Sequence, residues 1–150
     1  MEVKKVFIFI ICLCLLSGCS FDKKELVCEK KLKDDNYYYD IVVISKFNSN
    51  KLLIELDSKA TYHLTEEGLK EKDTFKKLLE EKNDKYKDNE YIKVSYEITD
   101  NEVIVNENII VDDEFLYKGK DLVSVYLGNE RGYKSIKSSF EENHFTCEER

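Results

Sequence analysis

The sequence predicts an α+β fold in which two β-hairpins form an antiparallel sheet and the helices pack on one face of it, in the order ββαββα. Two observations favour this fold. Two separate pairs of segments have the composition or the period-two alternation of strands, and each pair is followed by a segment with a helical period. The two halves are offset by about fifty residues, which is consistent with an ancient internal repeat.

The beginning of the chain has the layout of a secretory leader. Two lysines precede a run of eleven apolar residues, 6–16, which is too short for a transmembrane helix because spanning a bilayer takes about 20 residues. The run ends in "LSGC", which resembles the lipobox of bacterial lipoproteins. The resemblance implies that residues 1–18 are removed and that Cys19 receives a diacylglyceryl group. The alternatives are a plain signal peptide and a short buried helix with an incidental cysteine.

Lipidation of Cys19 would attach the protein to a membrane. One acyl chain holds a protein only marginally, whereas two give a stable anchor. We therefore expect a lipoprotein signal peptide over residues 1–18, and a lipidated N-terminus with a short tether over residues 19–33. Residues 34–150 are then expected to form a single α+β domain on the extracytoplasmic face of the cell membrane.

The charge of the chain excludes some partners. Without residues 1–18, 22 basic and 30 acidic residues remain, a net charge of −8. This charge repels nucleic acid and anionic lipid surfaces, so we expect no nucleic-acid partner. A cationic partner is compatible with it, and so is a solvated acidic surface. We expect the anchor on Cys19 to provide the membrane contact, and an unknown protein or envelope component to be the partner.

The five cysteines fall into three groups. Cys12 and Cys14 lie in the apolar run and leave with it, and Cys19 takes the lipid. Cys28 and Cys147 remain, and an even number of cysteines in an exported domain predicts a disulfide. That bond would close a loop of 119 residues and stabilise the fold by about 4 to 5 kcal/mol. The alternative is two free thiols.

Residues 37–86 predict the first half of the domain. The segment 37–47 is rich in β-branched and aromatic residues, and Asn-Ser-Asn at 48–50 ends it. In the segment 52–64 every second residue is apolar or small, as in a strand with one buried face. The period then changes, and apolar side chains on one helical face predict a helix over residues 74–86.

The same order then repeats. Residues 91–99 alternate, residues 100–102 turn the chain, and residues 103–111 predict a returning strand. The following stretch is irregular, with a short strand expected at residues 122–127. A last helix is expected over residues 133–143, where apolar residues again fall on one helical face.

Several short motifs together suggest a family. They are the lipobox cysteine Cys19, the "KYK" that ends the first helix at 85–87, the Val111-Asp112 pair after the second hairpin, and the terminal "EENHFTC" at 141–147. In these motifs and in its layout the chain resembles the YehR-like small lipoproteins of Gram-positive bacteria. The resemblance implies their fold and a membrane location. That family has no assigned activity, so no catalytic residue or cofactor is carried over.

Few residues carry a signature of chemistry. His63 and His144 have no partner at metal-ligand spacing and no nearby nucleophile, so we interpret them as surface or helix-end histidines. Tyr37, Tyr38 and Tyr39 form the candidate partner-binding patch, because tyrosines stack on sugars and form protein contacts; ordinary packing on the sheet is the alternative. We expect no enzyme, cofactor or metal site, since the sequence has no phosphate loop, GxSxG or CxxC motif.

These observations predict a membrane-anchored, non-catalytic binding module that acts near the membrane surface. The alternative is an inhibitor of a basic envelope-attacking enzyme such as lysozyme, which an acidic domain would attract.

Overall fold

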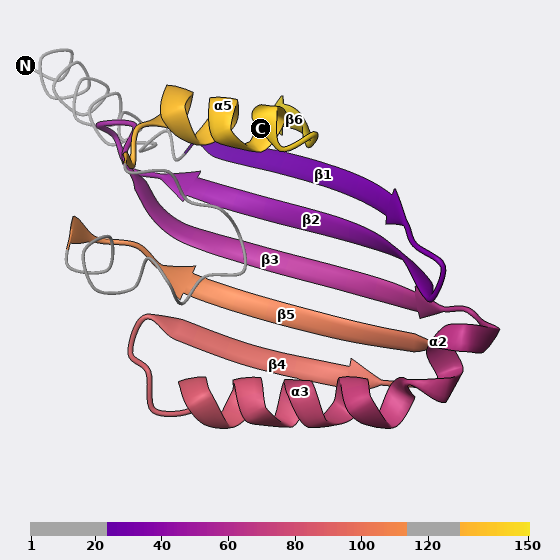
Figure 1. Ribbon diagram of the computed structural model, residues 1–150. Coiled ribbons are helices and arrows are strands. Elements are labelled where there is room, and N and C mark those ends of the chain that lie inside the picture. The colour runs from indigo at the N-terminus through magenta and orange to yellow at the C-terminus, as the bar shows by residue number, and fades with distance from the viewer. Residues whose placement is uncertain (1–23, 114–129) are drawn as a thin grey trace, which may run out of the picture.

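The computed structural model describes residues 24–113 and 130–150, which form one six-stranded antiparallel sheet with three helices (Figure 1). The elements are β1 (Glu25–Lys33), β2 (Tyr37–Phe47), β3 (Leu53–Leu64), α2 (Glu66–Lys70), α3 (Lys72–Tyr86), β4 (Ile92–Ile98), β5 (Glu102–Ile110), α5 (Tyr133–Glu142) and β6 (Thr146–Glu149). The strands lie in the order β4-β5-β3-β2-β1-β6. In Figure 1, α3 runs along the β4 side of the sheet and α5 along the β1 side.

The expected ββαββα order with two hairpins is wrong. Two further strands, β1 and β6, pair with each other and widen the sheet, and residues 25–33, expected to end the tether, form β1. The two hairpins are also joined, because β3 pairs with β5. Local periodicity does not reveal the extra strands: β1 ends in the charged sequence "EKKLK", and β6 has four residues. Both are defined by backbone pairing with distant segments.

The segments with the strongest periodicity form elements at their predicted places. β2 and β3 make the first hairpin, β4 and β5 the second, and α3 and α5 cover the two predicted helices. The signal peptide over residues 1–18, the lipidated Cys19 and the short strand expected at 122–127 lie outside the described residues. In the part of the chain that the structure describes, no helix is long and apolar enough to cross a membrane.

The two faces of the sheet differ. Residues directly opposite each other in an antiparallel pair point to the same side, so Ile41, Ala60 and Val105 share one face. Side chains of α3 and α5 line a cavity together with these three residues, so both helices lie over this face, which we call the groove face. The opposite face, here the outer face, carries polar residues such as Asp57 and Asn108.

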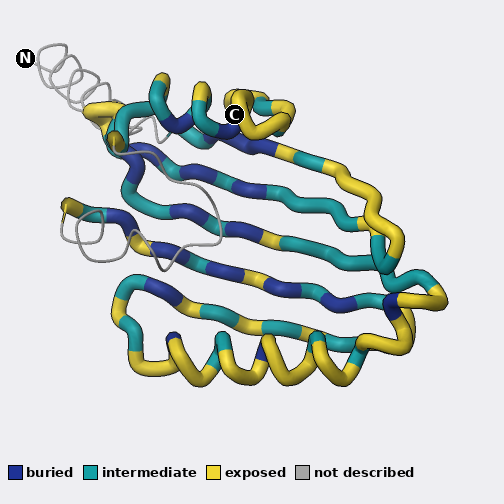
Figure 2. The backbone as a smooth tube through the Cα atoms, viewed as in Figure 1, coloured by how far each residue is buried: buried dark blue, intermediate teal, exposed yellow. Residues whose placement is uncertain are grey.

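Two apolar clusters hold the helices on the groove face. Ile136 and Phe140 of α5 belong to the larger cluster, which also contains buried residues of β1, β2, β3 and β5. Leu79 of α3 packs with Val103 and Val105 of β5 in the smaller one. Burial of one such side chain contributes about 1.5 to 3 kcal/mol. Figure 2 shows the buried positions along the strands, whereas much of α3 is exposed.

Candidate functional site

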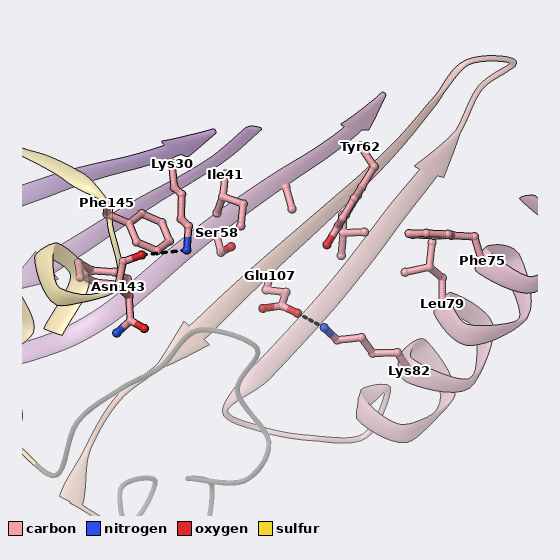
Figure 3. A pocket seen from close by; sticks show the side chains of 13 residues that line it. Lys30, Ile41, Ser58, Tyr62, Phe75, Leu79, Lys82, Glu107, Asn143 and Phe145 are labelled. Carbon is pink, nitrogen blue, oxygen red and sulfur yellow. Dashed lines mark hydrogen bonds and ion pairs between the residues drawn. The ribbon is translucent and has the colours of Figure 1, made fainter. Parts of the chain in front are cut away.

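A groove with a volume of about 290 Å³ lies on the groove face between α3 and α5 (Figure 3). The sheet forms its floor, α3 forms one wall, and the end of α5 with the turn after it forms the other. Pockets for small ligands in proteins begin at about 300 Å³. At about 290 Å³ the groove lies at the lower end of this range, which suits a small molecule or part of a larger one.

Most of the floor and the α3 wall is apolar. Ile41, Ala60 and Val105 come from three neighbouring strands and point into the groove because they occupy opposed positions in the sheet. Phe75 and Leu79 are four residues apart on α3, so they lie on the same side of the helix, and both line the groove. The groove can therefore remove an apolar ligand surface from water.

The opposite wall is aromatic. The rings of Phe140 and Phe145 pack edge to face with their centroids 5.1 Å apart, and the Phe145 N–H donates to the Phe140 carbonyl at 3.0 Å. Between them the chain leaves α5 through His144, whose φ of 66° turns the backbone toward β6. This turn places Phe145 beside the groove.

The predicted disulfide between Cys28 and Cys147 is present and ties this wall to the sheet. The two residues lie directly opposite each other in the β1–β6 pair. Phe145, two residues before Cys147, packs against the larger apolar cluster, as does Cys147 itself. The bond therefore fixes the segment that carries one side of the groove.

An ion pair lies in the middle of the groove, where Lys82 of α3 meets Glu107 of β5 (Figure 3). Glu107 is only 6% exposed and sits opposite Ser58 on the groove face of the sheet. An unpaired buried carboxylate is strongly destabilising, so this position requires a cationic partner. Lys82 provides it and ties α3 to the sheet.

Lys30 is the second cation in the groove, on β1 opposite Ile41. Its Nζ donates to the backbone carbonyl of Asn143 at 2.8 Å and lies 5.3 Å from the centroid of the Phe145 ring (Figure 3). Among the residues that the structure describes, no carboxylate forms an ion pair with Lys30. Within the described residues, the ammonium group of Lys30 therefore contacts a neutral carbonyl and an aromatic ring.

The three tyrosines of the predicted patch are divided between the two faces of β2. Tyr37 and Tyr39 point to the groove face, where their rings lie 5.5 and 5.4 Å from the ring of Tyr62. Burial, reinforced by the neighbouring tyrosines, raises the pKa of Tyr62, which lines the groove. Tyr38 is exposed on the outer face and stacks on His63 at 4.3 Å. The three side chains therefore do not form one surface.

His63 lies on the outer face between two carboxylates. Its Nδ1 is 2.8 Å from Glu102, and its Nε2 is 3.5 Å from Asp40. His144 is exposed after α5. Within residues 24–113 and 130–150, no group of three histidine, cysteine, aspartate or glutamate side chains could hold a metal ion.

A second polar network joins β2, β3 and β5 on the outer face. Lys46 lies 2.8 Å from Asp57 and 3.3 Å from Glu55, and the Asn108 amide donates to both carboxylates at 2.7 Å. Burial acts to raise the pKa of Asp57, but the hydrogen bonds from Asn108 and Lys46 outweigh it, so this pKa lies below its usual value. The bond to Asp57 raises the pKa of Lys46.

Sequence reasoning did not identify Lys30, Lys82 or Glu107 as site residues. The sequence does contain an indication of the ion pair. Glu107 interrupts the apolar positions of its strand, and Lys82 interrupts the apolar face of its helix. A charge of each sign at such positions predicts a buried pair. Lys30 had no signal, because its segment was interpreted as a tether.

Comparisons with known proteins support the fold. No protein-family model matches the chain, and neither does any curated protein. The NMR structure of the E. coli YehR protein is similar, with a TM-score of 0.57 and 16% sequence identity, and the match covers 84% of this chain and 92% of that one. An NMR structure of a protein from Streptococcus pneumoniae TIGR4 has a TM-score of 0.49 and 12% identity, over 83% and 84% of the chains. The chain has a YehR-like fold.

Proposed function

We propose that this chain is a lipid-anchored, extracytoplasmic binding module of a Gram-positive bacterium that holds a small ligand in the groove between α3 and α5. The groove itself carries the proposal. An apolar floor, aromatic walls and a few convergent polar groups are the usual features of a small-molecule site. The fold alone does not name the ligand, because one fold hosts many functions.

The lining of the groove favours binding over catalysis. Its described part contains neither a histidine nor a cysteine. Glu107, its carboxylate, is already engaged by Lys82, whereas a general base must be available to the substrate. Binding needs only apolar contact and a few fixed polar groups, and the groove offers both.

The anchor would place this groove close to the membrane. β1 begins at Glu25, six residues after the proposed lipidation site Cys19, so even a fully extended chain would separate them by only about 20 Å. The proposed ligand is therefore one that is met at the surface of the membrane.

The anchor is tested by replacing Cys19 with alanine in cells. The Cys19→Ala protein is expected in the soluble fraction or as an unprocessed precursor, whereas the wild-type protein sediments with membranes. Intact mass measurement separates a lipidated chain that begins at Cys19 from a full-length one. Equal fractionation and equal mass of the two proteins would contradict the anchor.

The groove is tested with an uncharged fluorescent probe, N-phenyl-1-naphthylamine, which brightens when it leaves water. A chain that begins at Ser20 is suitable, because every described strand and helix, and the disulfide, lie after this residue. Ala60→Phe fills the floor of the groove and is expected to abolish probe binding. Thr61→Phe is the matched control, because Thr61 is the next residue on β3 and points to the outer face.

The two variants together decide the outcome. Circular dichroism and thermal unfolding first establish that both are folded, and Ala60→Leu replaces Ala60→Phe if that variant is not. Loss of binding in the Ala60 variant alone supports the groove as the site. Equal binding by both variants, or no binding by the wild-type domain, would contradict it.

A further inference from the structure

The charges in the groove do not cancel. Lys82 and Glu107 neutralise each other in a direct ion pair. Lys30 adds a positive charge that no carboxylate of the described residues balances. The described residues of the lining therefore carry a local positive charge, although the whole chain has a net charge of −7.

The contacts of Lys30 leave it able to bind a further group. An ammonium group has three donors, and the backbone carbonyl of Asn143 accepts from one of them. The Phe145 ring beneath it positions the cation without neutralising it. Lys30 is therefore held at one end of the groove with its charge available.

The other end of the groove is apolar. Figure 3 shows Lys30 on one side of the floor, and Tyr62, Phe75 and Leu79 on the other. The rings of Tyr62 and Phe75 pack edge to face, with their centroids 5.3 Å apart and an angle of 60° between their planes. Ile41 of the floor lies between these aromatic side chains and Lys30 (Figure 3).

We infer that the groove binds a small amphipathic anion, with its carboxylate or phosphate head against Lys30 and its apolar body along the floor toward Tyr62 and Phe75. This inference rests on the proposed function and names the ligand class of the same groove. A charge-assisted hydrogen bond to Lys30 fixes the head, and burial of the body supplies the larger share of the affinity.

The charge distribution selects against other head groups. A cationic head would meet Lys30 at one end and would find Glu107 already paired in the middle. An uncharged head would leave the Lys30 charge without a counterion in a partly buried position. The same lysine therefore supplies both affinity and discrimination.

The test uses four amphiphiles with the same twelve-carbon chain, each below its micelle concentration: dodecanoate, dodecyl phosphate, dodecanol and dodecyltrimethylammonium. Their affinities for the chain that begins at Ser20 are measured by isothermal titration calorimetry. At least one of the two anions is expected to bind about tenfold or more tightly than dodecanol, because a hydrogen bond to a charged group is worth about that factor. The cation is expected to bind least. The two anions show whether the head is a carboxylate, a phosphate or either.

The variants that test the anion site, and their control, all lie on β1. Lys30→Gln is expected to remove the preference for anions over dodecanol, whereas Lys30→Arg should retain the preference. Lys33→Gln makes the same charge change on the outer face of β1 and should alter nothing, since Lys33 lies opposite Tyr38. If Lys30→Gln fails to fold, the comparison of head groups on the wild-type domain still decides.

The outcomes separate this inference from the proposed function. If dodecanol and the two anions bind equally, or if Lys30→Gln keeps the preference, the anion site is wrong while the groove remains a binding site for the uncharged probe. If neither the probe nor any amphiphile binds, both proposals fail.

Discussion

Cys28 and Cys147, which are 119 residues apart in sequence, lie directly opposite each other on β1 and β6 with their Cα atoms 4.1 Å apart and are joined by a disulfide. Cys28 is fully buried in the larger apolar cluster. The four-residue strand β6 is therefore held both by backbone pairing and by a covalent bond. This bond links the two ends of the described chain and supports the wall of the groove that carries Phe145.

Breaking this bond is expected to destabilise the domain. Cys147→Ser removes the constraint on a 119-residue loop, which the chain-entropy model values at about 4 to 5 kcal/mol. We expect the variant to have a clearly lower melting temperature than the wild-type protein. Reductant should lower the melting temperature of the wild-type protein and should not change that of the variant. Thr146→Ser, at the exposed neighbouring position, is the control and should melt like wild type. Free-thiol labelling of both cysteines in non-reduced, denatured wild-type protein would contradict the bond.

Gly68 of α2 is expected to tolerate no side chain. A Cβ at this position would lie 2.0 Å from the carbonyl oxygen of Asn36, which also accepts from the Thr65 N–H at 3.0 Å. Alanine favours a helix over glycine by about 1 kcal/mol, but a backbone clash this close outweighs that gain. Gly68→Ala is therefore expected to lower the free energy of unfolding by about 1 to 3 kcal/mol.

The matched control for this change is Gly132→Ala. A Cβ at Gly132 meets nothing within 4 Å, so its free energy of unfolding should stay within about 0.5 kcal/mol of the wild-type value. Urea unfolding curves of the two variants provide the measurement. Equal midpoints for both variants would show that the contact with Asn36 is absent in solution.

Asp57 is expected to make stability fall in acid. The pKa of Asp57 is lower in the folded protein than in the unfolded chain, where it is about 4. The ionised carboxylate therefore stabilises the fold above the unfolded pKa, and this contribution is lost as the pH falls through the folded pKa. Asp57→Asn should be less stable than wild type near neutral pH, and the difference should shrink below about pH 4. Asp88→Asn, at an exposed position after α3, is the control. The measurement is urea unfolding across pH, and a difference that is the same at every pH would contradict the prediction.

Ser45 is expected to be a stability defect of the core. It is fully buried on β2, and its Oγ has no hydrogen-bond partner among the described residues. A buried hydroxyl without a partner is unfavourable by roughly 1 kcal/mol or more, so Ser45→Ala should raise the free energy of unfolding by about that amount. Ser95→Ala makes the same change at an exposed position of β4 and should have little effect. Thermal unfolding that shows Ser45→Ala less stable than Ser95→Ala would refute the prediction.

The central part of the fold could be predicted because its signals are local. A period of two in β3 and β4, and a helical period in α3 and α5, follow from the geometry of a single strand or helix with one buried side, and β2 and β5 are rich in strand-forming residues. The even number of cysteines that remain after the predicted leader and the lipidated Cys19 are set aside likewise predicted the disulfide. The candidate site was not predicted: of the three tyrosines, Tyr38 points away from the groove, and Lys30 was assigned to a tether.

The sequence by itself therefore determined which side of β3 and of β4 is buried and where α3 and α5 form, because these properties depend on neighbours along the chain. Only the tertiary structure decided that residues 25–33 and 146–149 are strands and that β3 pairs with β5. Strand pairing is made by backbone hydrogen bonds between segments far apart in sequence, which leave little trace in the composition of a charged edge. The groove depends on this pairing, because β1 and the turn before β6 bring Lys30 and Phe145 together opposite α3.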